Sequence, residues 1–257
     1  IKRMMYLYEL RPAYFEEINF TIPESSNNIP DIVDEALFGL DVFKRTQGIY
    51  EEGGVSWWIE SIEHPRHGET SWLNSLPTAL VPPTPEACIG YAGAAAQMAI
   101  ILRKYSETLA AEYEASALKA MDWVKNHPDA PFVFSRERSR KAMESYAYIN
   151  LYRLTGEKTW HTLFQENMNE IFREGNEGNV SSRILDAATI YSLMDPSQVE
   201  INLQDECRNA LIAMADRLIE GADEETYGIL RNKDQELSRF VTMSSKVLPV
   251  VMAHNLS

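Results

Sequence analysis

Apolar residues recur at helical spacing along most of the chain, and residues 31–47 show the pattern clearly. Their apolar side chains fall on one face of a helix, at Ile32, Ala36, Leu40 and Phe43. Pro30 suits the first helical turn, and Asp31 and Asp34 complement the positive end of the helix dipole. The pattern therefore predicts an amphipathic helix over residues 31–47.

The same spacing predicts a succession of helices with short links. Further helices are expected at residues 4–10, 85–105, 107–126, 135–154, 158–174, 181–194, 199–221 and 237–256. Gly156 suits the left-handed position just after a helix end. Antiparallel helices in this order predict one all-α domain over residues 1–257, a barrel or toroid of helical hairpins. The sequence has no fixed-period repeat, which disfavours a regular solenoid.

One long segment, residues 48–84, departs from the helical pattern. Only residues 50–60 are rich in side chains that favour β-structure. The segment contains adjacent glycines, four prolines, three tryptophans and two histidines. Connections of this length without regular structure are uncommon and are usually functional. We therefore expect a functional loop in this part of the chain.

Composition narrows the class of partner. The 257 residues carry a formal net charge of −14, which argues against nucleic acid or an anionic membrane, because phosphate binding needs a basic patch. No apolar stretch approaches the roughly 20 residues that span a bilayer. Cys88 and Cys207 fall in apolar helical patterns and lack metal-site spacing, so we expect two buried thiols and neither metal nor cofactor. Because the chain starts at Ile1, we interpret it as an excised segment, and cellular compartment and oligomeric state stay open.

Residues 22–35 resemble a segment of a known enzyme family. They read Ile-Pro-Glu-Ser-Ser-Asn-Asn-Ile-Pro-Asp-Ile-Val-Asp-Glu. This closely resembles the Ile-Pro-Glu-Ser-Gly-Asn-Gly-Ile-Pro-Asp-Ile-Leu-Asp-Glu segment of family 9 glycoside hydrolases, the cellulase-type enzymes. Shorter similarities occur in the family's order at residues 6–12, 54–55, 80–102, 151–157 and 213–228. The resemblance implies an (α/α)6 barrel, in agreement with the helical pattern.

The resemblance also implies an inverting hydrolase that acts on β-linked, gluco-configured oligo- or polysaccharides. In this reaction one carboxyl protonates the glycosidic oxygen, and a second, about 6.5–9.5 Å away, activates water. The family's base lies in an Asp-Ala-Gly-Asp motif that would precede Ile1, and its acid is a glutamate that would follow Ser257. The catalytic carboxylates are therefore expected outside this segment.

The segment at residues 48–84 contains the side chains that a sugar cleft needs. Aromatic rings stack on the C–H faces of sugars, and polar side chains bind their hydroxyls. The resemblance implies that a histidine and a tryptophan from this loop line the cleft. The candidate substrate-binding residues here are Trp57, Trp58, Glu60, His64, His67 and Trp72. The alternative is that these tryptophans fill gaps between helices.

Two further segments resemble cleft regions of the family. Phe134 is a candidate aromatic platform, and Glu137 belongs to a charge cluster where the family has a tryptophan. Arg239 is a candidate sugar contact, and Glu236 stands where the family has an aromatic residue. The alternative for the Arg-rich stretch at residues 134–138 is a solvated helix start.

Three interpretations of function follow from these residues. The first is an endoglucanase-related hydrolase. The second is an exo-β-D-glucosaminidase acting on chitosan oligosaccharides, because Glu60, Glu137 and Glu236 suit a protonated amino sugar through charge-assisted hydrogen bonds. The third is a catalytically silent helical scaffold that binds carbohydrate or protein. Carbohydrate is the expected partner in the first two.

Overall fold

The computed structural model describes residues 1–50, 52–62, 76–133, 137–174, 184–223 and 250–254. The chain forms two compact units. The first unit contains residues 1–135 and 153–156, and the second contains residues 136–152 and 157–257. The single domain expected over residues 1–257 stays a prediction.

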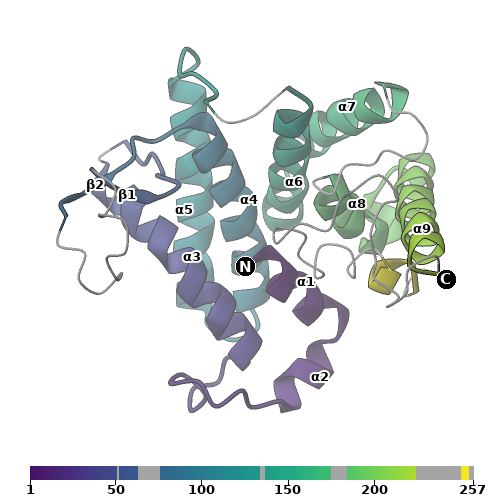
Figure 1. Ribbon diagram of the computed structural model, residues 1–257, viewed down its shortest axis with the longest axis horizontal. Coiled ribbons are helices and arrows are strands. Elements are labelled where there is room, and N and C mark those ends of the chain that lie inside the picture. Colours follow the sequence, from purple (N-terminus) through teal and green to yellow (C-terminus); the bar gives the residue numbers. More distant parts are fainter. Residues whose placement is uncertain (51, 63–75, 134–136, 175–183, 224–249, 255–257) are drawn as a thin grey trace. The chain divides into compact units, whose positions relative to one another are not determined.

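Helices dominate the first unit. They are α1 (Lys2–Leu10), α2 (Pro12–Glu17), α3 (Asp31–Ile49), α4 (Pro85–Leu102) and α5 (Glu107–Asn126). Helices α4 and α5 pack against each other as a hairpin, and α3 lies beside them (Figure 1). Each helix of the hairpin begins at a hydroxyl cap: Thr84 accepts from the backbone N–H of Ala87 at 3.2 Å, and Ser106 accepts from that of Leu109 at 3.3 Å.

Helix α4 forms the centre of the core of the first unit because its sequence consists largely of small apolar residues. Small side chains let neighbouring backbones approach closely, and these alanines are fully buried: Ala87, Ala92, Ala95, Ala96 and Ala99. Among the described residues, α4 is a helix long and apolar enough to cross a membrane, but 89% of it is buried inside the protein. Such burial is typical of a core helix.

Helix α3 confirms the amphipathic helix predicted at residues 31–47 and extends it to Ile49. Ile32, Ala36 and Leu40 are buried on its inner face. At its start, the carboxylate of Asp31 accepts hydrogen bonds from the backbone N–H of Phe20 at 2.6 Å and from Ser25 Oγ at 2.7 Å. Asp31 therefore ties the preceding loop to the helix, in addition to complementing the helix dipole.

The second unit is also helical. It contains α6 (Glu137–Thr155) up to residue 152, α7 (Lys158–Glu174), α8 (Ile184–Leu193), a 3₁₀ turn (Pro196–Gln198) and α9 (Ile201–Asp223). Residues 250–254 are helical as well. Helices α8 and α9 pack against each other. The core of this unit is rich in fully buried aromatic and aliphatic side chains, among them Tyr146, Ile149, Phe164, Tyr191 and Leu211.

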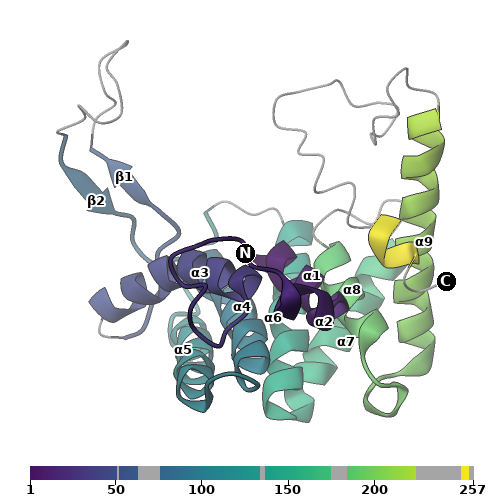
Figure 2. The same ribbon diagram turned by 90° about the horizontal axis from the view of Figure 1, so that it is seen from below.

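A two-stranded antiparallel ribbon, β1 (Ile59–Ser61) and β2 (Thr78–Leu80), interrupts the helices of the first unit. Figure 2 shows the ribbon extending away from α3, α4 and α5. The β-rich stretch predicted at residues 50–60 therefore forms a strand only at its end. Residues 53–56 contact helices instead of a partner strand.

Candidate functional site

The structure describes three of the predicted sugar-binding residues, and they lie together at the start of the ribbon. Trp57 and Trp58 are half-buried, and Glu60 is exposed in β1. Glu137 begins α6, but its side chain lies outside the description. The other predicted positions also lie outside the described residues: His64, His67, Trp72, Phe134, Glu236 and Arg239. Their roles stay predictions.

The register of the ribbon places Trp58 and Glu60 on one face. Glu60 pairs with Ala79 across the two strands. The N–H of Val81 donates to the carbonyl of Trp58 at 3.2 Å, which continues the ladder to that residue. Because alternate residues of an extended chain share a face, this register assigns the side chains of Trp58 and Glu60 to the same face. This is the pair of groups that a sugar ring engages through its C–H face and its hydroxyls.

Two glycines at the base of the ribbon allow its close approach to the helices. Gly53 has a φ of +86°, a backbone conformation that residues with a Cβ adopt at a cost. A Cβ at Gly53 would lie 2.5 Å from the side chain of Lys119, and one at Gly54 would lie 2.7 Å from Pro83. A Cβ at Gly54 would also lie 2.8 Å from Trp123 Nε1. Packing therefore favours glycine at both positions, and backbone conformation favours it at Gly53 as well.

The next two residues are fixed by hydrogen bonds. The N–H of Val55 donates to Cys88 Sγ at 3.3 Å, and the N–H of Ser56 donates to Thr46 Oγ1 at 3.0 Å. Both acceptors lie in helices, Thr46 in α3 and Cys88 in α4. The segment that leads into Trp57 and Trp58 is thus held by the helical core before the ribbon begins.

Both cysteines of the chain are structural in this environment. Cys88 and Cys207 are free and buried, which confirms the expected buried thiols. Burial raises the pKa of the Cys88 thiol to about 12, with the Val55 backbone contact opposing it, and burial likewise raises the pKa of Cys207. Neither thiol is a nucleophile at neutral pH. Among the described residues, no group of three or more His, Cys, Asp and Glu side chains is arranged to hold a metal ion.

Two histidines outside the loop lie in different environments. His127 ends α5 and its Nδ1 lies 2.8 Å from the carbonyl of Trp123, which is a capping role. His161 instead lies half-buried in α7, stacked on Tyr152, with its Nε2 2.9 Å from the hydroxyl of Tyr191. Aromatic rings on α6 and α8 therefore surround His161.

Known proteins share both sequence and fold with this chain. No family model matches it. It is 24% identical over 251 residues to a xyloglucan-specific endo-β-1,4-glucanase of Bacteroides ovatus, covering 87% of this chain and 41% of that protein. It is 29% identical over 120 residues to a cellulose 1,4-β-cellobiosidase of Acetivibrio thermocellus, covering 45% of this chain and 13% of that protein.

Solved structures extend the likeness to nearly the whole chain. One, a family 9 endoglucanase, has a TM-score of 0.81 at 18% identity and covers 99% of this chain and 49% of that one. Another, a thermostable endoglucanase from Alicyclobacillus acidocaldarius, has a TM-score of 0.77 at 16% identity, and the match covers 99% of this chain and 50% of that one. The all-α class predicted from sequence, part of an (α/α)6 barrel, is thereby confirmed.

The chain spans 41% of the length of the Bacteroides protein and about half of the solved structures, at 49% and 50%. The amino-acid sequence of residues 22–35, the order of the shorter similarities and the fold all point to the same family. Sequence and fold together show a likeness to the family 9 glycoside hydrolases.

Proposed function

We propose that the chain is part of an inverting glycoside hydrolase that acts on β-linked, gluco-configured oligo- or polysaccharides, as an endoglucanase does. The observation that carries the proposal is the similarity to an endo-β-1,4-glucanase over 87% of the chain. The fold supports it, because the likeness to a family 9 endoglucanase reaches a TM-score of 0.81 over 99% of the chain.

The described residues contribute the rim of a sugar cleft in this proposal. Trp58 offers a flat apolar face, and Glu60 offers hydrogen-bond acceptors beside it on the ribbon. The bond is cleaved by two carboxyls, one that protonates the leaving oxygen and one that activates water on the opposite side of the ring. We place those two groups outside residues 1–257, in the rest of the enzyme.

The amino-sugar alternative depends on three glutamates, of which only Glu60 has a described side chain. Its carboxylate is exposed on the ribbon, where water screens its attraction for an ammonium group. We therefore give preference to a neutral β-glucan as substrate.

The test is an assay of the full-length protein on cello-oligosaccharides, xyloglucan and glucosamine oligomers. We expect hydrolysis of a β-1,4-glucan, with the product first appearing by proton NMR as the α-anomer, because a single displacement inverts the anomeric carbon. Products that first appear as the β-anomer would overturn the inverting mechanism. Binding of sugar without turnover would favour the silent scaffold, and faster cleavage of glucosamine oligomers would favour the amino-sugar enzyme.

A further inference from the structure

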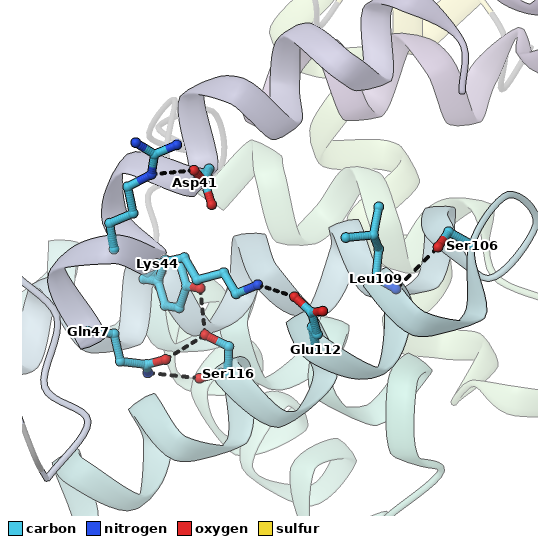
Figure 3. A network of polar contacts seen from close by, with 9 residues as sticks. Asp41, Lys44, Gln47, Ser106, Leu109, Glu112 and Ser116 are labelled. Atoms are coloured by element: carbon cyan, nitrogen blue, oxygen red, sulfur yellow. Dashed lines mark hydrogen bonds and ion pairs between the residues drawn. The ribbon is translucent and has the colours of Figure 1, made fainter. Parts of the chain in front are cut away.

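A buried glutamine in the last turn of α3 has every polar atom of its side chain engaged. Gln47 Nε2 donates to the carbonyl of Gly53 and to the carbonyl of Ser116, both at 3.0 Å. Gln47 Oε1 accepts from Ser116 Oγ at 2.5 Å. Figure 3 shows the side chain of Gln47 directed at Ser116, which lies in α5. The amide can form these bonds in only one orientation, because its nitrogen is the donor and its oxygen the acceptor.

A tyrosine from α4 completes this network and sets the direction of its hydrogen bonds. The hydroxyl of Tyr91 lies 2.6 Å from Ser116 Oγ. Since Ser116 uses its hydrogen toward Gln47, Tyr91 is the donor to Ser116. Burial raises the pKa of Tyr91 far above its ordinary value of 10, with the nearby charge of Asp41 adding to the effect and the Ser116 hydrogen bond opposing it. The phenol therefore keeps its proton and remains a donor over the whole physiological pH range.

The carbonyl that Gln47 holds belongs to the residue where the chain turns toward the ribbon. Gly53 closes a turn through its N–H to the carbonyl of Tyr50 at 2.9 Å, and its positive φ aims the next residues at the core. The Gln47 amide is thus the link between this turn and the α3–α4–α5 core. A carbonyl left without its donor inside a protein costs free energy, so loss of the Gln47 amide destabilises the turn.

A second anchor lies one residue earlier in α3. Thr46 Oγ1 accepts from the N–H of Ser56, and Ser56 Oγ donates to the carbonyl of Trp58 at 3.1 Å. A third contact reaches the other strand, since the hydroxyl of Tyr50 donates to the carbonyl of Val81 at 3.4 Å. The end of α3 therefore contacts both the segment that enters β1 and the segment that leaves β2.

From these contacts we propose that Gln47 is a positioning residue of the enzyme, acting on sugar binding through the ribbon that carries Trp57, Trp58 and Glu60. The inference rests on the proposed function, because it assigns the ribbon to the sugar cleft. Gln47 has no contact with sugar in this proposal. It acts by holding the Gly53 carbonyl, which keeps the tryptophans in one orientation before substrate arrives. Substrate binding then does not have to supply the free energy of ordering them.

The test is Gln47→Met in the full-length enzyme, which keeps the length of the side chain and removes both donors. We expect KM for a cello-oligosaccharide to rise about tenfold while kcat changes by less than about twofold, since binding and not the chemical step is affected. Hydrogen exchange is expected to accelerate at residues 53–61 in the variant. An unchanged KM together with unchanged exchange at these amides would overturn the proposal.

The chain offers a matched control in the second unit. Gln204 in α9 is also buried, and its Nε2 donates to two backbone carbonyls, those of Tyr191 and Met194, both at 2.9 Å. Gln204→Met likewise removes two hydrogen bonds that a buried glutamine donates to backbone carbonyls. It is expected to lower the melting temperature as Gln47→Met does, but to leave KM unchanged. An equal rise of KM in both variants would overturn the positioning role and make Gln47 a residue of general stability.

A milder variant covers the case in which Gln47→Met does not fold. Ser116→Ala leaves both donors of Gln47 in place and removes the hydroxyl that donates to the Gln47 amide oxygen and accepts from Tyr91. We expect KM to rise about threefold in this variant, with a smaller acceleration of exchange at residues 53–61; no change in either would count against the proposal. Wild-type enzyme inactive on every β-glucan would instead contradict the proposed function, and the exchange data would still decide whether Gln47 holds the ribbon.

Discussion

The imidazole of His127 lies flat on the indole of Trp123, with ring centroids 4.3 Å apart and planes within 16° of parallel. Its Nε2 lies 2.7 Å from Glu52 Oε2. Because His127 ends α5 and Glu52 directly precedes Gly53, one side chain both closes the helix and contacts the base of the ribbon. The ribbon is thus held from the α5 side as well as from α3.

The two partners of this contact are expected to differ in their effect on stability. His127→Ala should lower the free energy of unfolding by about 1 kcal/mol, because it removes an aromatic stack and the capping contact of α5. Glu52→Gln should cost no more than about 0.5 kcal/mol, because the Glu52 side chain is 71% exposed and exposed ion pairs contribute little. Urea denaturation of the full-length protein measures both, and a larger loss for Glu52→Gln would contradict this ranking.

Three glycine-to-alanine variants are expected to separate backbone strain from steric contact. Gly53→Ala should lose about 2 kcal/mol, because it combines a positive φ of +86° with a contact to Lys119. Gly156→Ala should lose about 1 kcal/mol, because its φ is +74° but no atom lies within 4 Å of the new Cβ. Gly48→Ala, inside α3 and also free of close contacts, should gain about 0.5 kcal/mol.

Denaturation midpoints in urea rank these three variants by stability. If Gly53→Ala were as stable as Gly156→Ala, the Lys119 side chain would have moved aside, and the contact would not contribute. If Gly53→Ala were as stable as Gly48→Ala, the positive φ itself would be absent from the native protein.

Much of the helical architecture was predictable because the apolar period of 3.6 residues survives in nearly every helix. The helices at residues 107–126 and 158–174 have the predicted ends. Helix α2 was missed, because it buries no residue and so shows no apolar face. The β2 strand was missed as well, since Thr78–Leu80 is too short and too exposed to show alternation. The prediction at residues 237–256 falls largely outside the described residues.

The non-helical segment with its tryptophans was predictable from composition, but its second strand and the residues that hold the ribbon were not. Gln47 continues the inner face of α3 four residues after Phe43, so a polar residue at a core-facing position was the available signal. Its partner Ser116, and Tyr91, which contacts Ser116, come from distant parts of the sequence. No local sequence pattern predicts the contact between these side chains, because the contact depends on how three helices pack.

His161 is expected to make stability depend on pH. The N–H of Glu200 donates to the hydroxyl of Tyr191 at 2.7 Å, and that hydroxyl can then donate its own hydrogen to His161 Nε2. The bond requires a neutral imidazole as acceptor. Burial lowers the pKa of His161 below 6.5, and the charge of Glu200 opposes this. Burial raises the pKa of Tyr191 to about 12, so the phenol keeps its proton.

The direction of this pH dependence follows from the difference in proton binding between the folded and the unfolded state. As pH falls below 6.5, the unfolded chain takes up a proton at His161 before the folded protein does, so the free energy of unfolding decreases. The decrease stops once the pH is below the folded pKa. The measurement is the difference in pH slope between wild type and His161→Gln, which isolates the contribution of this one side chain. Equal slopes over about one pH unit on either side of the ordinary histidine pKa would contradict the prediction.

Trp58→Ala is expected to weaken sugar binding without unfolding the protein, if the ribbon forms the rim of the cleft. Loss of one aromatic platform should raise KM for a cello-oligosaccharide about fivefold, which corresponds to about 1 kcal/mol. Trp72→Ala is expected to do the same, on the prediction from sequence that it stacks on a sugar ring. Glu60→Gln is the control on the same face, since an amide keeps one acceptor and should change KM by less than about twofold. Circular dichroism checks that the helices are intact. Unchanged KM in both tryptophan variants would make these indoles packing residues and would place the sugar cleft on another surface.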